Sequence, residues 1–213
     1  MIRMVIETIK DLFNSNKLSN DEWTIGWEKN KNYMNVLQED YDPLNPSRLA
    51  LGLIRSKSKV LSCGCGAGRE VKFLVEQGCK VTALDHSKNM IDLSKKLEQK
   101  AKYVLGDMVT FQSKEKFDYV ICLWNTINFI ETKELRKEFI ENCYKNLKPN
   151  GKLIILTKHA FANFGSMGRK LFSKRDFYFH PKQVDYWFKD TAFKVSKVDI
   201  KVNILIVAKK GNL

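Results

Sequence analysis

From residue 59 onward, short apolar runs alternate with segments whose apolar residues recur every three to four positions. An apolar run of about four to eight residues is typical of a buried strand, whereas the longer spacing indicates one face of a helix. The pattern predicts strands over residues 59–63, 79–85, 101–107, 117–124 and 151–157. It predicts helices over residues 69–78, 87–100, 132–147 and 180–190.

Strands and helices alternate along the chain, an order that is typical of a parallel sheet with connections over its faces. The end of the chain differs, because residues 193–210 contain two predicted strands with hardly any break at 201–203. Only a hairpin joins strands that closely, so the last strand is expected to be antiparallel to its partner. The sequence therefore predicts an α/β fold: a doubly wound, mostly parallel seven-stranded sheet with a C-terminal antiparallel β-hairpin.

The N-terminal segment carries a separate apolar helix face. Over residues 1–13 the apolar positions recur at helical spacing, and they are Ile2, Val5, Ile6, Ile9, Leu12 and Phe13. A helix of this length is marginal in water by itself, so this face is expected to pack on another part of the protein. We expect residues 1–45 to form a helical lid or cap, and residues 46–213 to form the main domain. The alternative is a helix that covers a sheet edge or a dimer contact.

The chain is strongly basic. Its 213 residues suffice for one domain with a sizeable core, and its formal net charge is +13. A basic surface attracts nucleic acid, anionic lipid or acidic metabolites. However, 30 of the basic residues are Lys and only seven are Arg, whereas phosphate recognition also tends to use arginine forks. The charge therefore leaves RNA as an alternative partner, and solvation of the surface is the simpler interpretation.

Hydropathy and cysteine usage favour a cytoplasmic protein. No apolar run approaches the roughly 20 residues of a membrane span, and charged residues interrupt the N-terminal run, which is unlike a secretory signal. Of the five cysteines, four lie in or beside apolar runs, where a thiol behaves as a small apolar group. We expect buried thiols, with neither a disulfide framework nor a metal site.

Three glycines follow the first predicted strand, in the stretch VLSCGCGAGRE. Gly64, Gly66 and Gly68 indicate that something approaches the backbone closely, because glycine is costly in an ordered segment. In an open parallel sheet, ligands bind beyond the carboxyl ends of the strands. Asp85 and Asp107 end the next two strands, where carboxylates can accept hydrogen bonds from ribose hydroxyls and from an adenine amino group. This combination suits an adenosine, and the Lys–Ser/Thr ending of a phosphate-binding loop is absent.

Five stretches together resemble the motifs of the class I S-adenosylmethionine-dependent methyltransferases, a family with a Rossmann-like sheet. In order they are VLSCGCGAGRE, VTALDHS, YVLGDM, FDYVICLWNTINFI and NLKPNGKLIIL, between residues 59 and 157. Dinucleotide-binding enzymes share the glycines and the acid, but their usual spacing is G-x-G-x-x-G, which this chain does not have. The resemblance implies S-adenosyl-L-methionine as the cofactor.

The resemblance also implies a place for each part of the cofactor. The glycine loop would pass under the methionine part, and Asp85 would bind the ribose. Asp107 and Met108 would border the adenine, and Leu123 would line the sulfonium end. The cofactor-binding residues expected on this basis are Ser62, Gly64, Cys65, Gly66, Gly68, Asp85, His86, Asp107, Met108 and Leu123.

Ser62 departs from the family pattern, which usually has Asp or Glu two residues before the first glycine. In the family that carboxylate helps to hold the ammonium group of the cofactor, directly or through water. Ser62 can accept a hydrogen bond but adds no charge. With serine at this position, either the affinity for the cofactor is lower, or another acid compensates, or the fold has a non-catalytic use. The interpretation we favour is a neutral change that the family tolerates.

Methyl transfer from a sulfonium needs alignment above all, and positioning can supply on the order of several kcal/mol. A base is needed only if the nucleophile arrives protonated, and His159, after the fifth predicted strand, is the best-placed candidate. The chain lacks the Asp/Asn-Pro-Pro-aromatic motif with which the family methylates DNA bases. We expect transfer to an O or N atom of a small molecule. The alternatives are an RNA methyltransferase and a catalytically silent S-adenosylmethionine-binding module.

Residues 158–182 form a basic and aromatic segment, at the place where the family carries acceptor-specific insertions. The segment has six Lys or Arg, six aromatic residues, two His and one acid. One interpretation is a lid that contacts an anionic or aromatic acceptor, or that stacks on RNA bases. The other is a solvated loop whose aromatic side chains cover the sheet edge.

Overall fold

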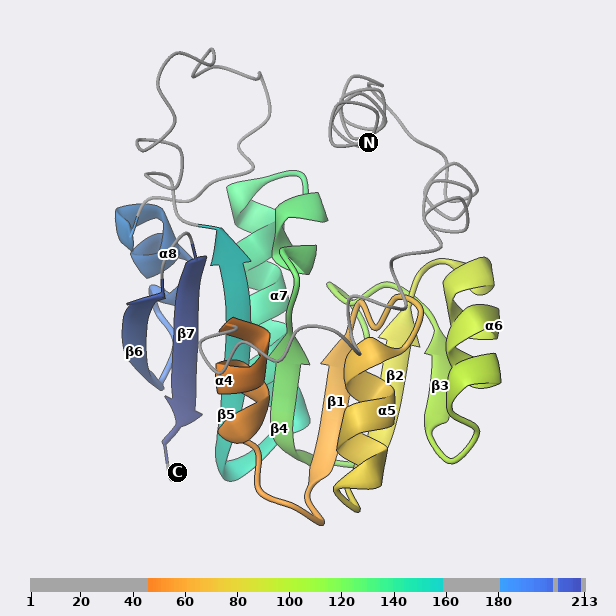
Figure 1. The fold of residues 1–213 in the computed structure, drawn as a ribbon. Coiled ribbons are helices and arrows are strands. Elements are labelled where there is room, and N and C mark those ends of the chain that lie inside the picture. Colours follow the sequence, from red (N-terminus) through yellow and green to blue (C-terminus); the bar gives the residue numbers. More distant parts are fainter. Residues whose placement is uncertain (1–45, 159–180, 201–202, 212–213) are drawn as a thin grey trace, which may run out of the picture.

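Seven strands form one sheet in the order β3-β2-β1-β4-β5-β7-β6 (Figure 1). The structure is a computed structural model that describes residues 46–158, 181–200 and 203–211. The strands are β1 (Lys59–Cys63), β2 (Lys80–Asp85), β3 (Lys102–Leu105), β4 (Phe117–Cys122), β5 (Leu147–Lys158), β6 (Phe193–Ile200) and β7 (Asn203–Lys210). The first five are parallel, and β7 pairs antiparallel with both β5 and β6. The predicted fold class, including the C-terminal hairpin, is confirmed.

Helices cover both faces of this sheet. They are α4 (Pro46–Gly52), α5 (Arg69–Glu76), α6 (Lys88–Leu97), α7 (Lys133–Asn146), α8 (Pro181–Phe188) and the short 3-10 helix η1 (Thr126–Phe129). In Figure 1, α4 and α5 lie in front of the sheet with α6 beside them, whereas α7 and α8 lie behind it. The arrangement is therefore doubly wound, as the alternation of strands and helices predicts.

The sheet separates two apolar cores. Neighbouring strand residues point to opposite faces, so Val60 packs with α4 and α5 while Leu61 packs with α7 and α8. Trp187 and Phe139 are the largest fully buried side chains, and both lie in the core on the α7 and α8 side. Two buried layers of this kind hold the carboxyl ends of the strands in fixed positions relative to one another.

Local sequence signals explain the ends of several helices. Ser87 caps α6 by accepting a hydrogen bond from the backbone N–H of Met90 at 3.4 Å, as serine commonly does at the start of a helix. Gly78 follows α5 with a φ of 77°, the left-handed conformation that commonly ends a helix. In the first turn of α7 the apolar residue Leu135 is 38% exposed. Arg136 takes the buried position in that first turn, and its Nε donates to the carbonyl of Ile127.

Strand β5 begins four residues earlier than the apolar pattern predicts. Phe117 of β4 pairs with Leu147, but Tyr119 pairs with Lys152, so the register shifts between these two pairs. The residues that bulge out contain Lys148, whose Nζ lies 2.8 Å from a carboxylate oxygen of Asp118. Pattern analysis missed this part of the strand because it is polar and contains Pro and Gly.

The five cysteines are buried and free, as predicted. Burial raises the pKa of Cys122 and of Cys143 well above the ordinary value, so neither thiol ionises at neutral pH. Within the described residues, no group of three or more His, Cys, Asp or Glu is arranged to hold a metal ion. In the same part of the chain, no helix has both the length and the apolar character required to cross a bilayer.

Candidate functional site

The glycine loop leaves the carboxyl end of β1 and leads into α5. Gly64, Gly66 and Gly68 have φ values of 69°, 52° and 90°, a region that side chains rarely allow. The backbone N–H groups of Gly64 and Cys65 donate to the carbonyl of Leu84 at 2.8 and 3.0 Å. The loop is therefore fastened to the end of the neighbouring strand β2.

Asp85, the last residue of β2, also fastens this loop. One carboxylate oxygen accepts the backbone N–H of Gly66 at 2.8 Å, and the other accepts that of Ser87 at 2.9 Å. The side chain of His86 is 63% exposed, and its Nδ1 lies 3.6 Å from Asp85. Because a carboxylate oxygen has more than one lone pair, Asp85 retains the capacity to accept ligand hydroxyl groups.

Two of the glycines meet protein atoms where a ligand had been expected. A Cβ on Gly64 would lie 2.1 Å from Cγ2 of Thr126, at the start of η1. A Cβ on Gly68 would lie 2.2 Å from Oγ of Ser94 and 3.1 Å from its Cα, on α6. Close packing of the loop on its own protein therefore requires glycine at both positions, in addition to any ligand.

Ser62 and Cys65, both predicted to contact the cofactor, are deeply buried. Ser62 is 3% exposed within β1, and Cys65 is 2% exposed within the loop. Burial and then the nearby charge of Asp85 raise the pKa of Cys65 far above its ordinary value. The thiol thus stays protonated and acts as a packing group in the core beside α5.

The end of β3 presents Asp107 and Met108. Asp107 is exposed, and one of its carboxylate oxygens accepts the backbone N–H of Val109 at 2.8 Å. Met108 is half-buried and packs against the core on the α7 side. The backbone N–H of Gly106 donates to the carbonyl of Asp85 at 2.9 Å, so the two acidic strand ends are joined directly.

The turn after β4 contains the most unusual backbone of the described site. Trp124 and Asn125 have φ values of 57° and 63°, although neither is glycine. Such conformations cost roughly 1–3 kcal/mol each and gather at functional sites. The indole Nε1 of Trp124 and the amide Oδ1 of Asn125 are also buried without a hydrogen-bond partner among the described residues. Leu123 itself, the residue that the sequence singled out, is 3% exposed in the core.

Several contacts hold this turn in place. The guanidinium carbon of Arg69 lies 3.4 Å from the centre of the Trp124 ring, a cation–π contact that joins α5 to the end of β4. The backbone N–H of Asn125 donates to the carbonyl of Leu156. The hydroxyl of Thr157 donates to the amide oxygen of Asn128 at 2.6 Å. The turn therefore bridges the ends of β4 and β5. The only signal for it in the sequence is Asn125, because asparagine tolerates a left-handed backbone better than most residues do.

Other predicted features lie outside the described residues. They are His159, nearly all of the basic and aromatic segment 158–182, and the N-terminal segment 1–45. The candidate base and both candidate lids accordingly stay predictions.

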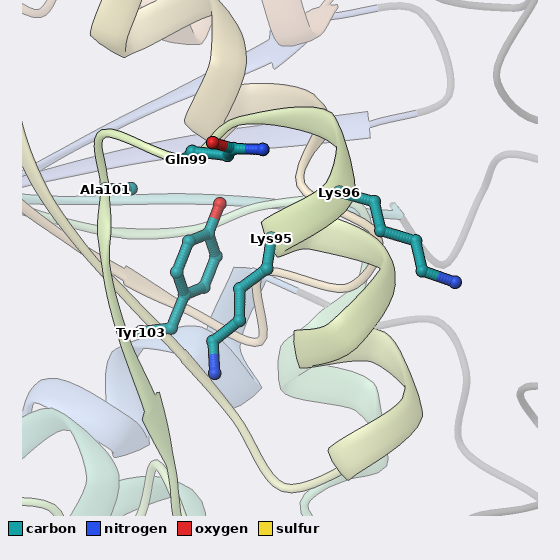
Figure 2. Close-up of a pocket in the computed structure, with 5 residues that line it drawn as sticks. All are labelled: Lys95, Lys96, Gln99, Ala101 and Tyr103. Atoms are coloured by element: carbon teal, nitrogen blue, oxygen red, sulfur yellow. The ribbon is translucent and has the colours of Figure 1, made fainter.

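An open hollow of about 470 Å³ lies elsewhere, between the last turn of α6 and the start of β3. Its lining consists of Lys95, Lys96, Gln99, Ala101 and Tyr103. In Figure 2 the Lys95 side chain runs alongside the Tyr103 ring, whereas that of Lys96 points away. The hydroxyl oxygen of Tyr103 lies within 3 Å of the carbonyl oxygens of Ser94 and Glu98, which share its hydrogen bond. This hollow faces away from the carboxyl ends of the strands and is not part of the candidate site.

Comparison with known proteins agrees with the geometry. The family described as "Methyltransferase domain" matches residues 60–151. The chain is similar to a Rickettsia typhi protein named "Ubiquinone biosynthesis O-methyltransferase", with 35% identity over 106 residues, which are 48% of this chain and 42% of that protein. The chain thus spans less than half the length of this relative.

Two solved structures share the fold. A TehB-like S-adenosylmethionine-dependent methyltransferase from Corynebacterium glutamicum superposes with a TM-score of 0.67, at 20% identity, over 88% of this chain and 97% of that one. The N-methyltransferase NodS from Bradyrhizobium japonicum, in complex with S-adenosyl-L-homocysteine, superposes with a TM-score of 0.62, at 18% identity, over 82% and 91%. The matched domain, the strand order and the glycine loop agree with one another and with the predicted resemblance to the class I S-adenosylmethionine-dependent methyltransferases.

Proposed function

We propose that this protein transfers the methyl group of S-adenosyl-L-methionine to an oxygen or nitrogen atom of a small molecule. The observation that carries the proposal is the glycine loop held against Asp85 at the carboxyl ends of β1 and β2. The match of residues 60–151 to the methyltransferase domain supports the reaction, and the name of the Rickettsia typhi relative supports an oxygen atom as the acceptor.

The groups at the strand ends fit the cofactor chemically. Its ribose carries two hydroxyl donors, and the carboxylate of Asp85 offers acceptors for them. Its adenine carries an amino donor, which suits the exposed carboxylate of Asp107, with Met108 beside the ring. Gly66 and His86 both lie beside the carboxylate of Asp85. When bound, S-adenosyl-L-methionine supplies an electrophilic methyl group on a sulfonium.

The protein's contribution to the reaction is mainly positioning. The ends of β4 and β5 are held together by the Trp124–Asn125 turn, and a rigid wall there would align an acceptor with the methyl group. The unpaired indole N–H and amide oxygen would bind complementary polar groups of that acceptor, because burying them unpaired costs about 1–3 kcal/mol each. His159 is the proposed base for an acceptor that arrives protonated.

Calorimetry with S-adenosyl-L-homocysteine, the product form of the cofactor, tests the cofactor site. We expect one-to-one binding, weakened by Asp107→Asn, because the amide is a poorer acceptor for the adenine amino group. Glu138→Gln, an exposed acid on α7, is the matched control and should leave the affinity unchanged. A wild-type protein that binds NADH more tightly than S-adenosyl-L-methionine would contradict the proposal.

The net charge of +13 favours RNA as a second candidate acceptor. RNA binding through the basic surface should weaken steeply as salt rises, because counterions are released. Absence of RNA binding at low salt removes this candidate. Tight cofactor binding without methyl transfer to phenols, catechols, amines or RNA would instead indicate a silent binding module.

A further inference from the structure

Glu70 is a buried carboxyl group in the first turn of α5, the helix that follows the glycine loop. It is the second residue of α5, two positions after Gly68, and it is only 6% exposed. Among the described residues, no Lys or Arg makes an ion pair with it within 4.0 Å. A buried carboxylate without a counter-charge is costly, and proteins generally pair such groups.

The neighbours of Glu70 offset its negative charge only in part. The guanidinium of Arg69 is held over the Trp124 ring, although its positive charge acts on Glu70 from there. Asp85 adds a second negative charge nearby, and backbone N–H groups occupy one site on each of its oxygens. The loop therefore has an excess of buried negative charge on the side of α5.

The first turn of α5 lies between the ends of β1 and β4. Glu70 follows the glycine loop that leaves β1, and the adjacent Arg69 stacks on the ring of Trp124, just after the end of β4. The negative charge of Glu70 also contributes to the raised pKa of Cys65 and of Cys122, although burial is the main cause of both shifts. The methionine part of the cofactor is expected in this region.

We propose that Glu70 binds the α-ammonium group of the cofactor's amino-acid part. The inference rests on the proposed function, and it names a residue that the sequence did not single out. A charge-assisted hydrogen bond from an ammonium group would satisfy the carboxylate. From the first turn of α5, Glu70 would thus supply the negative charge that Ser62 lacks at the end of β1.

Two ligands distinguish this role from a structural one. S-Adenosyl-L-homocysteine carries the amino-acid group, whereas 5′-methylthioadenosine has the same adenosine and sulfur without it. Glu70→Gln keeps the shape and removes the charge. It should weaken S-adenosyl-L-homocysteine by about tenfold to a hundredfold, as the loss of one partner of a buried pair does. The affinity for 5′-methylthioadenosine should stay within about twofold, because that ligand makes no use of the charge.

Glu76→Gln is the matched control, since Glu76 is exposed on the same helix and should leave both affinities unchanged. Glu70→Asp keeps the charge and should preserve most of the preference for the ligand with the amino-acid group. Should Glu70→Gln fail to fold, Glu70→Met tests the same ratio of affinities.

The possible results separate the two proposals. Unchanged S-adenosyl-L-homocysteine binding by Glu70→Gln overturns the role of Glu70 and leaves the methyltransferase function standing. Equal losses for both ligands also overturn it, because Glu70 would then only shape the loop. A wild-type protein that binds neither ligand overturns the proposed function itself.

Discussion

Asp85 shows how one side chain serves the fold and the site together. Its two oxygens receive backbone N–H groups from the glycine loop and from the cap of α6, and the same carboxylate is the proposed ribose acceptor. The acid was identified from its position at a strand end. Its role in holding the loop depends on a contact with Gly66, 19 residues earlier, which no local pattern encodes.

Asp85→Asn should therefore impair both roles. The amide has one oxygen, so one of the two backbone N–H groups would face an NH₂ donor and lose its acceptor. We expect a loss of about 1–3 kcal/mol in the free energy of unfolding, with binding of S-adenosyl-L-homocysteine more than tenfold weaker. Urea denaturation and calorimetry measure the two effects. Asp92→Asn, on the exposed face of α6, is the control, and unchanged ligand affinity in Asp85→Asn would contradict the ribose assignment.

Glu70 has a second consequence, for stability in the absence of ligand. Burial raises its pKa, the charge of Arg69 opposes this rise, and that of Asp85 adds to it. A raised pKa in the folded state means that the stabilisation from the protonated form is complete below the unfolded pKa of about 4.3. It is lost as the pH rises through the folded pKa.

Ligand-free Glu70→Gln should consequently gain stability over the wild type as the pH rises from 4 to 8. Melting temperatures of the two proteins, measured across this range, check the trend. Glu76→Gln should follow the wild type throughout. If the difference in melting temperature between Glu70→Gln and the wild type is the same at every pH, the pKa of Glu70 is not raised by folding.

At the scale of elements, the site depends on how the glycine loop packs against its neighbours. Gly64 packs against η1 and Gly68 packs against α6, so the loop connects η1, α6 and its own helix α5. The sequence indicated a close approach at these positions but assigned it to a ligand. Within α7, Phe139, Ile140 and Cys143 are buried, whereas Leu135 is exposed.

A pair of substitutions tests the contact between Gly64 and Thr126. Gly64→Ala should destabilise the protein by about 2–4 kcal/mol, since the new Cβ meets a methyl group and the backbone stays left-handed. Thr126→Ser in that background removes the methyl group and keeps the hydroxyl that donates to Leu123. It should restore part of the loss, because only the backbone strain would remain. Denaturant unfolding of both variants measures this coupling.

Gly52→Ala is the control for that pair, because a Cβ there meets nothing within 4 Å. It should leave stability unchanged or slightly higher, as replacing glycine at a permissive backbone position usually does. Full additivity of Gly64→Ala and Thr126→Ser would refute the proposed contact.

At the scale of the whole molecule, two cores enclose a sheet that leaves one end of its strands for chemistry. The order β3-β2-β1-β4-β5 brings the glycine loop between Asp85 and the Trp124–Asn125 turn. The N-terminal segment 1–45 lies outside the described residues, and its role as a lid over this end is a proposal drawn from its apolar helix face.

Deletion of residues 1–20 tests the lid. Removing a lid should leave a folded protein with lower turnover and faster cofactor exchange, because the reacting groups would be less well enclosed. Stopped-flow exchange and steady-state turnover measure these effects. Full cofactor affinity and full turnover in the truncated protein would refute the lid, and a lower melting temperature with aggregation would indicate a structural helix.

By itself, the sequence determined most of the helices and strands, the fold class and the set of residues at the strand ends. Apolar periodicity records which side of each segment is buried, and the alternation of strands and helices restricts the topology strongly. The tertiary structure decided which residues meet. Gly64 with Thr126, Gly68 with Ser94, and Arg69 with Trp124 are contacts between distant parts of the chain. Periodicity carries no information about partners, so the burial of Glu70 and the strained Trp124–Asn125 turn emerged only when the sheet brought these elements together.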